Sequence, residues 1–462
     1  MAIDPDIFRA YDIRGKVGPA ITTEVAELLG KAFGTYIAKL SGRSEIAVGR
    51  DNRLTGEELK GALMRGLVSA GCTVYDIGMS TSPALYFAVG NWKLPGGINV
   101  TGSHNPKDEN GFKLVGEGAR PVAGDEILKV KAIIDSGEFR TGDGRIELRE
   151  VKPEYFGRLK QAARLTRPFR IAVDTGNGVA GLYAPPFLRD AGCELFELYT
   201  ELDGNFPNHL PDPQMPENVV DLQAKVRETG AELGLAFDGD GDRIGVIDEH
   251  GERHEADYIL MLLARALLAK QPGAKIIMDV KTSQPVVDDI RAHGGEAIIW
   301  KTGHSFIKLK MREEEAPLAG EASGHIFFQE NFYADDALFA ACKLLSYLSE
   351  TEMPLSEHLQ GMSRWYTSAE LRVPCADDRK WSVVDNVASE LRQRHEALEI
   401  DGIRAEWPDG WALIRASNTG PNLTLRFESK SEAGLKEIET EVMAALRKHV
   451  DVPDFSQAPP GH

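Results

Sequence analysis

Strand-like and helix-like patterns of apolar residues alternate along the chain, and one arrangement of them occurs three times. In the first copy, an apolar strand ends at Asp51, a helix is predicted over residues 59–70, and further strands are predicted over residues 72–77 and 97–100. A polar segment, TGSHNP at residues 101–106, follows the last of these strands.

The second and third copies repeat this order of elements. Their predicted strands and the polar segments that follow them cover residues 170–173, 193–199 and 238–243 in the second copy, and residues 275–280, 296–300 and 320–325 in the third. Strands separated by helices predict parallel sheets with right-handed crossovers. Such sheets bind ligands at the carboxyl ends of their strands, so we expect the three polar segments to carry function.

The predicted helix of the first copy has local signals at both ends. Thr55 and Glu58 have the spacing of a capping box, in which both side chains bond to the backbone at the start of a helix. Gly71 directly follows the last helical residue, and a glycine at that position commonly ends a helix.

The chain after about residue 364 follows another pattern. The tripeptide 408–410 predicts a turn, and residues 412–415 and 423–427 alternate like an antiparallel pair of strands. A helix is predicted over residues 432–449. The sequence therefore predicts an α/β fold of three similar mixed or parallel α/β units and a smaller α+β unit, with bounds at residues 1–150, 151–252, 253–364 and 365–462.

Composition narrows the class of protein. The chain has 462 residues and a net charge of −18, which predicts several domains and argues against a broad nucleic-acid-binding face. Cys72, Cys193, Cys342 and Cys375 lack C-x-x-C spacing, which favours buried free thiols. The N-terminus does not resemble a secretory signal, and the most apolar helix, residues 258–269, is too short to span a membrane. We expect a cytoplasmic protein that binds neither membranes nor nucleic acid.

Three aspartates lie between two apolar runs in the segment 233–247, LGLAFDGDGDRIGVI. In an extended chain Asp238 and Asp242 would be roughly 13 Å apart, so one ion can bind both and Asp240 only where the backbone curls, as the intervening glycines permit. Oxygen ligands favour magnesium, manganese or calcium. A calcium hand fits poorly, because its sixth position requires glycine and here holds Arg243. An acidic turn without an ion is the alternative.

Ser103 lies in TGSHNP, where the turn that its Asn-Pro neighbours force is expected to leave the hydroxyl exposed. That arrangement suits a nucleophile, and an ordinary serine turn is the alternative. A Ser-His-Asp hydrolase fits poorly, because G-x-S-x-G is absent and His104 adjoins the serine. If Ser103 carried a phosphoryl group, the aspartate loop could hold a hard cation against its oxygens. That cation, with Arg14, Lys113 and Arg243, would neutralise the phosphoryl charge.

The third polar segment, GEASGH, suits a sugar. Glu321, Ser323 and His325 stand at alternate positions and face one way if the segment is extended. A carboxylate, a hydroxyl and an imidazole on one face suit paired sugar hydroxyls, and a solvated strand end is the alternative. Lys281 and His304 follow the two preceding strands of the same unit, so both can converge on the same ligand.

The segment RASNTGPN, residues 415–422, suits a phosphate. Arg415 lies close in sequence to Ser417, Asn418 and Thr419. A guanidinium group, hydroxyls and backbone donors are the groups that hold a phosphate. A plain hairpin loop is the alternative.

Six motifs together resemble the α-D-phosphohexomutase family, and within it the bacterial phosphomannomutase/phosphoglucomutase branch. They are AYDIRG at 10–15, TGSHNP at 101–106, DGDGDR at 238–243, KTGHS at 301–305, GEASGH at 320–325 and RASNTGPN at 415–422. The motifs span the whole chain, and their combination is far more specific than any one of them.

The resemblance implies four domains around a central cleft and an enzyme that interconverts hexose 1-phosphate and hexose 6-phosphate, with mannose or glucose as the sugar. It implies a hexose 1,6-bisphosphate intermediate, phosphorylation of Ser103, and Mg²⁺ held by the phosphoserine and the three aspartates. It also implies that Lys113 and His304 are the acid–base residues and that Arg14, His104 and Arg243 orient the phosphoryl group. Tyr11 and Lys281 would line the cleft, and Glu321, Ser323 and His325 would bind the sugar. Arg415, Ser417, Asn418 and Thr419 would bind the phosphate that does not react.

Other functions stay open on the sequence alone. Ala322 stands where this branch more often has methionine and the glucosamine-phosphate enzymes often have glutamine, so a phosphoglucosamine mutase is one alternative. A metal-assisted sugar phosphatase and a non-catalytic sugar-phosphate binder are two more. The expected partner is a small phosphosugar, bound by a monomer or a weak homo-oligomer.

Overall fold

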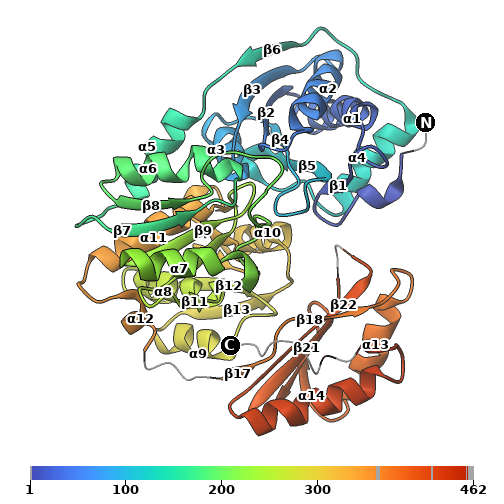
Figure 1. Ribbon diagram of the computed structural model, residues 1–462. Coiled ribbons are helices and arrows are strands. Elements are labelled where there is room, and N and C mark those ends of the chain that lie inside the picture. Colours follow the sequence, from blue (N-terminus) through green and yellow to red (C-terminus); the bar gives the residue numbers. More distant parts are fainter. Residues whose placement is uncertain (1–2, 361–364, 418–419, 454, 456–462) are drawn as a thin grey trace.

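The computed structural model describes residues 3–360, 365–417, 420–453 and 455. These residues form four sheets that follow one another along the chain, as the sequence colours in Figure 1 show. Each of the first three sheets has parallel strands at its centre and antiparallel strands added at one side, whereas the strands of the fourth pair antiparallel. We call the parts of the chain that carry these sheets units 1 to 4, and the predicted fold class is confirmed.

Unit 1 has the strand order β1-β5-β4-β2-β3-β6. Its strands are β1 (Ile13–Lys16), β2 (Glu45–Arg50), β3 (Thr73–Met79), β4 (Gly96–Val100), β5 (Glu109–Gly116) and β6 (Arg145–Leu148). Its helices are α1 (Thr23–Ser41), α2 (Gly56–Ser69), α3 (Ser82–Asn91) and α4 (Asp125–Ser136).

The start of α2 differs from the sequence prediction. Thr55 stands at the N-cap, but its side chain makes no capping bond there, so the predicted capping box is wrong. The Thr55 hydroxyl instead accepts a hydrogen bond of 3.0 Å from Asn110 on β5. The helix ends close to the predicted place, at Ser69 with Ala70 as its C-cap, and Gly71 after the cap has a φ of +77°.

Units 2 and 3 repeat the parallel centre of unit 1, with the orders β11-β10-β9-β7-β8 and β13-β12-β14-β15-β16. Unit 2 contains α5 (Lys152–Ala162), β7 (Arg170–Asp174), α6 (Ala184–Asp190), β8 (Glu194–Leu198), α7 (Val220–Thr229), β9 (Leu233–Phe237), β10 (Ile244–Ile247) and β11 (Arg253–His254). Unit 3 contains α8 (Ala256–Leu268), β12 (Lys275–Asp279), α9 (Gln284–Ala292), β13 (Glu296–Trp300), α10 (His304–Glu314), β14 (Leu318–Gly320), β15 (Ile326–Phe328), β16 (Ala334–Asp335), α11 (Ala337–Ser349) and α12 (Leu355–His358).

Unit 4 has the strand order β17-β22-β21-β20-β19, and β18 also pairs with β22. Its elements are β17 (Tyr366–Thr367), β18 (Leu371–Pro374), α13 (Lys380–Leu391), β19 (Glu396–Leu398), β20 (Ile403–Trp407), β21 (Gly410–Ala416), β22 (Asn422–Ser429) and α14 (Glu432–Leu446). The predicted antiparallel pair is confirmed, since β21 and β22 pair with Arg415 opposite Thr424. Short 3-10 helices elsewhere are η1 (Pro5–Ile7), η2 (Glu117–Ala119), η3 (Val179–Leu182), η4 (Pro216–Asn218) and η5 (Gln329–Asn331).

The apolar cores divide the molecule unequally. One large core runs through units 1, 2 and 3 and includes residues of α3, α5, α6, α8 and α11. Unit 4 has a core of its own, between its sheet and the helices α13 and α14. Units 3 and 4 meet in a small buried cluster of Val280, Trp411 and Leu413. In Figure 1, unit 4 accordingly stands apart from the more closely packed first three units.

Polar contacts add to this junction between units 3 and 4. Arg404 donates hydrogen bonds to the carbonyl oxygens of Val280 and Thr282, at 3.2 and 2.9 Å. Glu428 accepts hydrogen bonds from the backbone N–H of Gln284 at 2.8 Å and from Trp411 Nε1 at 2.6 Å.

Two further expectations concern burial and membranes. The four cysteines are free and buried, as predicted. Across the described ranges of the chain, none of the helices has the length and apolar character needed to cross a membrane.

Candidate active site

The three polar segments follow β4, β9 and β14, at the carboxyl ends of the parallel strands, as the repeat predicts. Two contacts join them across the units. Ser103 Oγ lies 3.0 Å from Asp238 Oδ2, and Arg243 Nε donates to His325 Nε2 at 3.0 Å. The segments of units 1, 2 and 3 therefore form one site.

The aspartate loop curls between β9 and β10, as an ion-binding role requires. Gly241 has a φ of +76°, a backbone conformation that side chains disfavour. Oxygen atoms of Asp238, Asp240 and Asp242 consequently lie within 4.8 Å of one another, and all three side chains are fully buried. The loop also needs a glycine at 239, because a Cβ there would lie 2.4 Å from the carbonyl oxygen of Ser103.

The donor set fits a hard divalent cation. The Oδ1 atoms of Asp240 and Asp242 are buried and, in the described part of the chain, have no hydrogen-bond partner. Carboxylate oxygens that accept no hydrogen bond are free to act as ligands for magnesium, manganese or calcium. The other oxygens of the same two residues contact Lys113 Nζ, at 2.7 Å for Asp240 Oδ2 and 2.5 Å for Asp242 Oδ2.

The charges of this cluster shift one another's pKa values. Burial raises the pKa of Asp238 well above its usual range, and the neighbouring carboxylates of Asp242 and Asp240 raise it further. Burial also raises the pKa of Asp240, but its ion pair with Lys113 and its hydrogen bonds to Ser82 and Asp238 together outweigh burial and lower that pKa below the ordinary value. Burial lowers the pKa of Lys113, but Asp240 and Asp242 outweigh it and hold that pKa well above the usual range. The lysine is therefore a fixed positive charge.

Ser103 is buried, with 3% of its surface exposed, so the prediction of an exposed hydroxyl is wrong. The reason is that the aspartate loop of unit 2 covers the serine, and this contact has no local signal in the sequence. The hydroxyl donates to Asp238 and also lies 3.1 Å from His104 Nδ1. Ser103 has a φ of +51°, which a residue other than glycine rarely adopts.

Basic side chains surround the serine. Arg14 on β1 forms an ion pair with Asp12 and donates to Asn105 Oδ1 at 3.4 Å. Burial lowers the pKa of His104 well below its usual range, and the charges of Arg243 and Arg14 lower it further. The His104 ring is therefore neutral at pH 7, and the guanidinium groups carry the positive charge.

Two histidines of unit 3 stack above a buried ion pair that the sequence reasoning missed. The rings of His304 and His325 are 5.5 Å apart. Asp335 Oδ2 lies 2.9 Å from His325 Nδ1, and Asp335 Oδ1 lies 2.5 Å from Lys308 Nζ. Because the Arg243 guanidinium can only donate, His325 Nε2 must accept, so Nδ1 carries the hydrogen that faces Asp335. The adjacent acidic residues at the end of β16 were the available signal.

His304 and Tyr11 bring units 3 and 1 together. Their rings lie 5.2 Å apart with the edge of one toward the face of the other. Burial lowers the pKa of His304 well below its usual range, and the charge of Lys308 lowers it further, so the imidazole is neutral. Burial, with a smaller effect of the Asp12 carboxylate, raises the pKa of Tyr11 to about 12.

The segment GEASGH forms a turn between β14 and β15, so the premise of an extended segment is wrong. Glu321 N donates to the carbonyl of His325, and Gly324 has a φ of +91°. Glu321 and His325 are nevertheless both buried at the site, and Ser323 is half-buried. Glu321 accepts a hydrogen bond from Gly303 N, and burial raises its pKa to about 7.

The predicted phosphate loop joins β21 and β22. Arg415 Nε donates to Asp401 Oδ2 at 2.8 Å, and Asp401 also accepts from Thr302 N of unit 3 at 3.1 Å. Lys281 Nζ, at the end of β12, contacts Glu370 of unit 4 at 3.2 Å. Ser417 is buried, with its N–H donating to the carbonyl of Asn422. The predicted residues Asn418 and Thr419 lie outside the described residues.

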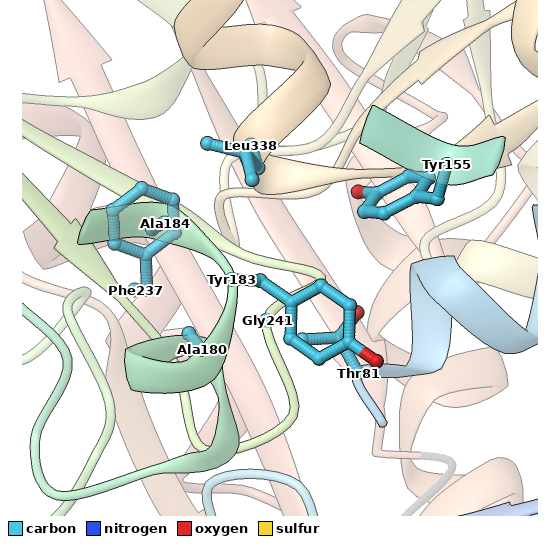
Figure 2. A pocket seen from close by; sticks show the side chains of 8 residues that line it. All are labelled: Thr81, Tyr155, Ala180, Tyr183, Ala184, Phe237, Gly241 and Leu338. Atoms are coloured by element: carbon cyan, nitrogen blue, oxygen red, sulfur yellow. The ribbon is translucent and has the colours of Figure 1, made fainter. Parts of the chain in front are cut away.

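A small cavity lies behind the aspartate loop, where units 1, 2 and 3 meet (Figure 2). Gly241, Thr81, Tyr155 and Leu338 are among the residues that line it. Its volume of about 10 Å³ is room for about one water molecule, so it is not a sugar-binding site. The rear of the loop is thus packed against the shared core, which fixes the loop in place.

Fold and site together define a protein of four successive α/β and α+β units, with a serine beside a loop of three aspartates whose oxygens fit a hard cation. The chain matches the phosphoglucomutase/phosphomannomutase family throughout: the α/β/α domains I, II and III match residues 5–141, 153–251 and 255–365, and the C-terminal domain matches residues 370–445. The chain belongs to this family.

Individual proteins similar to this chain belong to the same family. A phosphomannomutase/phosphoglucomutase of Pseudomonas putida is 43% identical, over 95% of both chains. A phosphoglucomutase of Neisseria gonorrhoeae is 42% identical, over 97% of this chain and 98% of its own. The crystal structure of a phosphoglucomutase/phosphomannomutase family protein from Burkholderia thailandensis matches with a TM-score of 0.92 and 42% identity, over 98% of this chain and 100% of that one. A solved N-acetylphosphoglucosamine mutase of Aspergillus fumigatus, 15% identical, shares the fold alone.

Proposed function

We propose that this chain is a phosphohexomutase that interconverts hexose 1-phosphate and hexose 6-phosphate, with mannose, glucose or both as the sugar. The observation that carries the proposal is the contact of 3.0 Å between the Ser103 hydroxyl and Asp238 of the aspartate loop. A serine that carries a phosphoryl group needs a partner that neutralises the added charge, and a cation held by these aspartates supplies it.

In the proposed reaction, the phosphoryl group passes from Ser103 Oγ to a free hydroxyl of the sugar phosphate. The bond between phosphorus and Oγ breaks, a bond to the sugar oxygen forms, and the hydroxyl proton moves to a base on the protein. His304, as a neutral imidazole, is suited to accept that proton. Lys113, the other residue proposed for acid–base catalysis, is held as a cation by Asp240 and Asp242 and would donate a proton only once these carboxylates no longer hold it. Arg14 and Arg243 would orient the phosphoryl group beside the neutral His104.

The resulting hexose 1,6-bisphosphate must then turn so that its other phosphate meets Ser103. Arg415 and Ser417, with Asn418 and Thr419, would hold the phosphate that does not react. Glu321, Ser323 and His325 would bind the sugar hydroxyls, between Tyr11 and Lys281.

Asp238, Asp240 and Asp242 would hold Mg²⁺ together with an oxygen of the phosphoserine. When bound, the ion would neutralise charge on the phosphoryl oxygens. Lys113 contacts two of these carboxylates and would neutralise their remaining charge.

We also propose a division of labour among the units at residues 1–150, 151–252, 253–364 and 365–462: phosphoserine, metal, sugar and phosphate binding, in that order. The protein would act in the cytoplasm as a monomer or weak homo-oligomer, on a small phosphosugar.

The alternatives predict different measurements. A phosphoglucosamine mutase would act on glucosamine 1-phosphate in preference to the mannose and glucose phosphates. A metal-assisted phosphatase would release inorganic phosphate steadily, whereas a mutase must exclude water. A non-catalytic binder would bind the sugar phosphates without converting them.

The experiment combines intact-mass analysis of the purified protein with coupled assays on mannose, glucose and glucosamine 1-phosphates. We expect one added phosphoryl group after treatment with glucose 1,6-bisphosphate, conversion of mannose or glucose 1-phosphate, and almost no free phosphate. Ser103→Ala should lack both the added mass and the activity while keeping the circular dichroism of the wild type. Normal turnover by Ser103→Ala would refute the proposal.

A further inference from the structure

Arg53, between β2 and α2, has a fully buried side chain and uses each of its N–H groups. An arginine has five of them in a rigid fork. They donate to Asp51 Oδ2 at 3.2 Å and to the carbonyl oxygens of Ser103 at 2.7 Å, Asn105 at 2.6 Å, Pro106 at 2.6 Å and Glu109 at 2.9 Å. One side chain thus fixes the backbone of the whole serine loop from below.

The partner of Arg53 holds the other side of the same loop. Asp51 Oδ2 accepts hydrogen bonds from Thr101 Oγ1 at 2.7 Å and from Gly102 N at 3.2 Å. Thr101 Oγ1 in turn accepts from Ser103 N at 2.8 Å. The N–H and the carbonyl of the serine are therefore both tied, directly or through one residue, to a single buried ion pair.

The packing of Arg53 explains the glycine that precedes the serine. A Cβ on Gly102 would lie 2.5 Å from the Cζ and Nε atoms of the guanidinium group. The guanidinium plane therefore lies directly against the backbone at this position, and any side chain at residue 102 would displace one or the other.

Unit 2 closes over the outer side of the arginine. The Phe206 ring lies 5.1 Å from Arg53 Cζ, and a Cβ on Gly204 would lie 2.6 Å from the carbonyl oxygen of Asn52. Unit 2 also supplies Asp238, so the same neighbouring unit packs against the arginine and provides the acceptor for the Ser103 hydroxyl.

We infer that Arg53 is a positioning residue for Ser103. The arginine holds the serine in its left-handed backbone conformation, with the hydroxyl directed at Asp238. Such a conformation persists only where the surroundings over-determine it. The four carbonyl contacts of Arg53 do so, and a lysine, whose donors radiate from one nitrogen atom, cannot reach all four. The inference rests on the proposed phosphoryl transfer through Ser103.

Arg53→Lys tests the inference, because it keeps the charge and loses the fork. We expect kcat to fall roughly 10- to 100-fold, the effect of a displacement near 1 Å, with KM changed less than about twofold. The rate at which glucose 1,6-bisphosphate phosphorylates Ser103, followed by intact mass, should fall by the same factor. Arg265→Lys is the matched control: this arginine of unit 3 binds Asp289 and the carbonyl of His358 and is mostly buried. It should lose stability but keep the wild-type transfer rate.

Gly102→Ala gives an independent test, because it presses on the guanidinium from the backbone side. We expect it to slow phosphorylation of Ser103, and to do so less in an Arg53→Ala background, where the methyl group has room. If Arg53→Lys does not fold, Gly102→Ala decides alone, and an unchanged transfer rate overturns the inference.

Wild-type kcat and transfer rate in Arg53→Lys overturn the inference, as does an equal fall of the transfer rate in Arg265→Lys. Failure of the proposed function is distinguishable from either result, because the wild-type protein itself would then take up no phosphoryl group from the bisphosphate.

Discussion

The hydroxyl oxygen of Ser103 lies 3.0 Å from Oδ2 of Asp238, a residue 135 positions further along the chain. The two residues belong to different units, each at the end of a central parallel strand. The proposed chemistry depends on this distance, because a phosphoryl group on the serine needs the positive charge of the cation that the aspartate loop is proposed to hold.

The close approach of the two loops can be tested at Gly239. A Cβ at this position would lie 2.4 Å from the carbonyl oxygen of Ser103, so Gly239→Ala must push the loops apart. We expect kcat in a coupled assay to fall about 100-fold or more, with a smaller change in KM. Gly157→Ala on α5 is the control, because a Cβ there meets no atom within 4 Å. It should raise helix stability by up to about 1 kcal/mol and leave activity unchanged. Full activity of Gly239→Ala would show that the loops need not touch.

The cation-binding capacity of the aspartate loop can be tested through Lys113. Lys113→Met leaves buried carboxylates without their counter-charge, so we expect a loss of roughly 3–5 kcal/mol in urea unfolding with EDTA present. Saturating Mg²⁺ should restore more stability to this variant than it adds to the wild type, because the ion takes over the neutralisation. Lys60→Met, which breaks the buried pair with Asp76 elsewhere in unit 1, should be destabilised without this response. Equal Mg²⁺ responses in both variants would contradict the assignment of the site.

The raised pKa of Glu321 predicts that the free energy of unfolding depends on pH. Burial raises its pKa in the folded protein to about 7, above the ordinary value of 4.5, so the folded state binds this proton more tightly than the unfolded state. The wild type should therefore lose stability as the pH rises from about 4.5 to 7, by an amount on the order of 3 kcal/mol at about 1.4 kcal/mol per pKa unit. Glu321→Gln keeps an acceptor for Gly303 N and removes the titration. Its advantage over the wild type in urea unfolding should grow across that range, and parallel curves would be the contrary result.

Arg415 should matter for binding more than for the chemical step. A hydrogen bond to a charged group contributes about 1.5–3 kcal/mol, which corresponds to a rise of roughly 10- to 100-fold in KM for Arg415→Ala. Mg²⁺-dependent stabilisation should stay as in the wild type, because Arg415 lies in unit 4. Arg392→Ala in the same unit, where the arginine is half-exposed and pairs with Glu399, should leave KM unchanged. An unaltered KM in Arg415→Ala would remove the phosphate cage from the proposal.

Local patterns were sufficient to predict the repeated units and the place of each loop. The strand ahead of TGSHNP, the glycine-spaced aspartates and the alternation on either side of RASNTGPN are all short-range signals. The structure confirms the antiparallel pairing of the last two strands, with Arg415 at their loop end.

Contacts between distant parts of the chain were not predictable in this way. The sequence predicts an exposed Ser103 and a Thr55 that caps its helix. Instead, the Ser103 hydroxyl donates to Asp238, and the Thr55 hydroxyl accepts a hydrogen bond from Asn110. Arg53 was missed for the same reason, whereas Asp335 has a sequence signal in its acidic neighbour Asp336. A single charged residue has no local signature, and its partners become visible only once the loops are folded together.

The separate core of unit 4 has a consequence for folding cooperativity. Parts of a protein unfold together where their buried apolar contacts are continuous. Between units 3 and 4, the buried apolar cluster consists of only Val280, Trp411 and Leu413 among the described residues. In the absence of ligand, the C-terminal unit should therefore melt in a transition of its own. A bisphosphate that binds Arg415 at one end and reaches Ser103 at the other would act as a reversible cross-link, and the two transitions would merge into one.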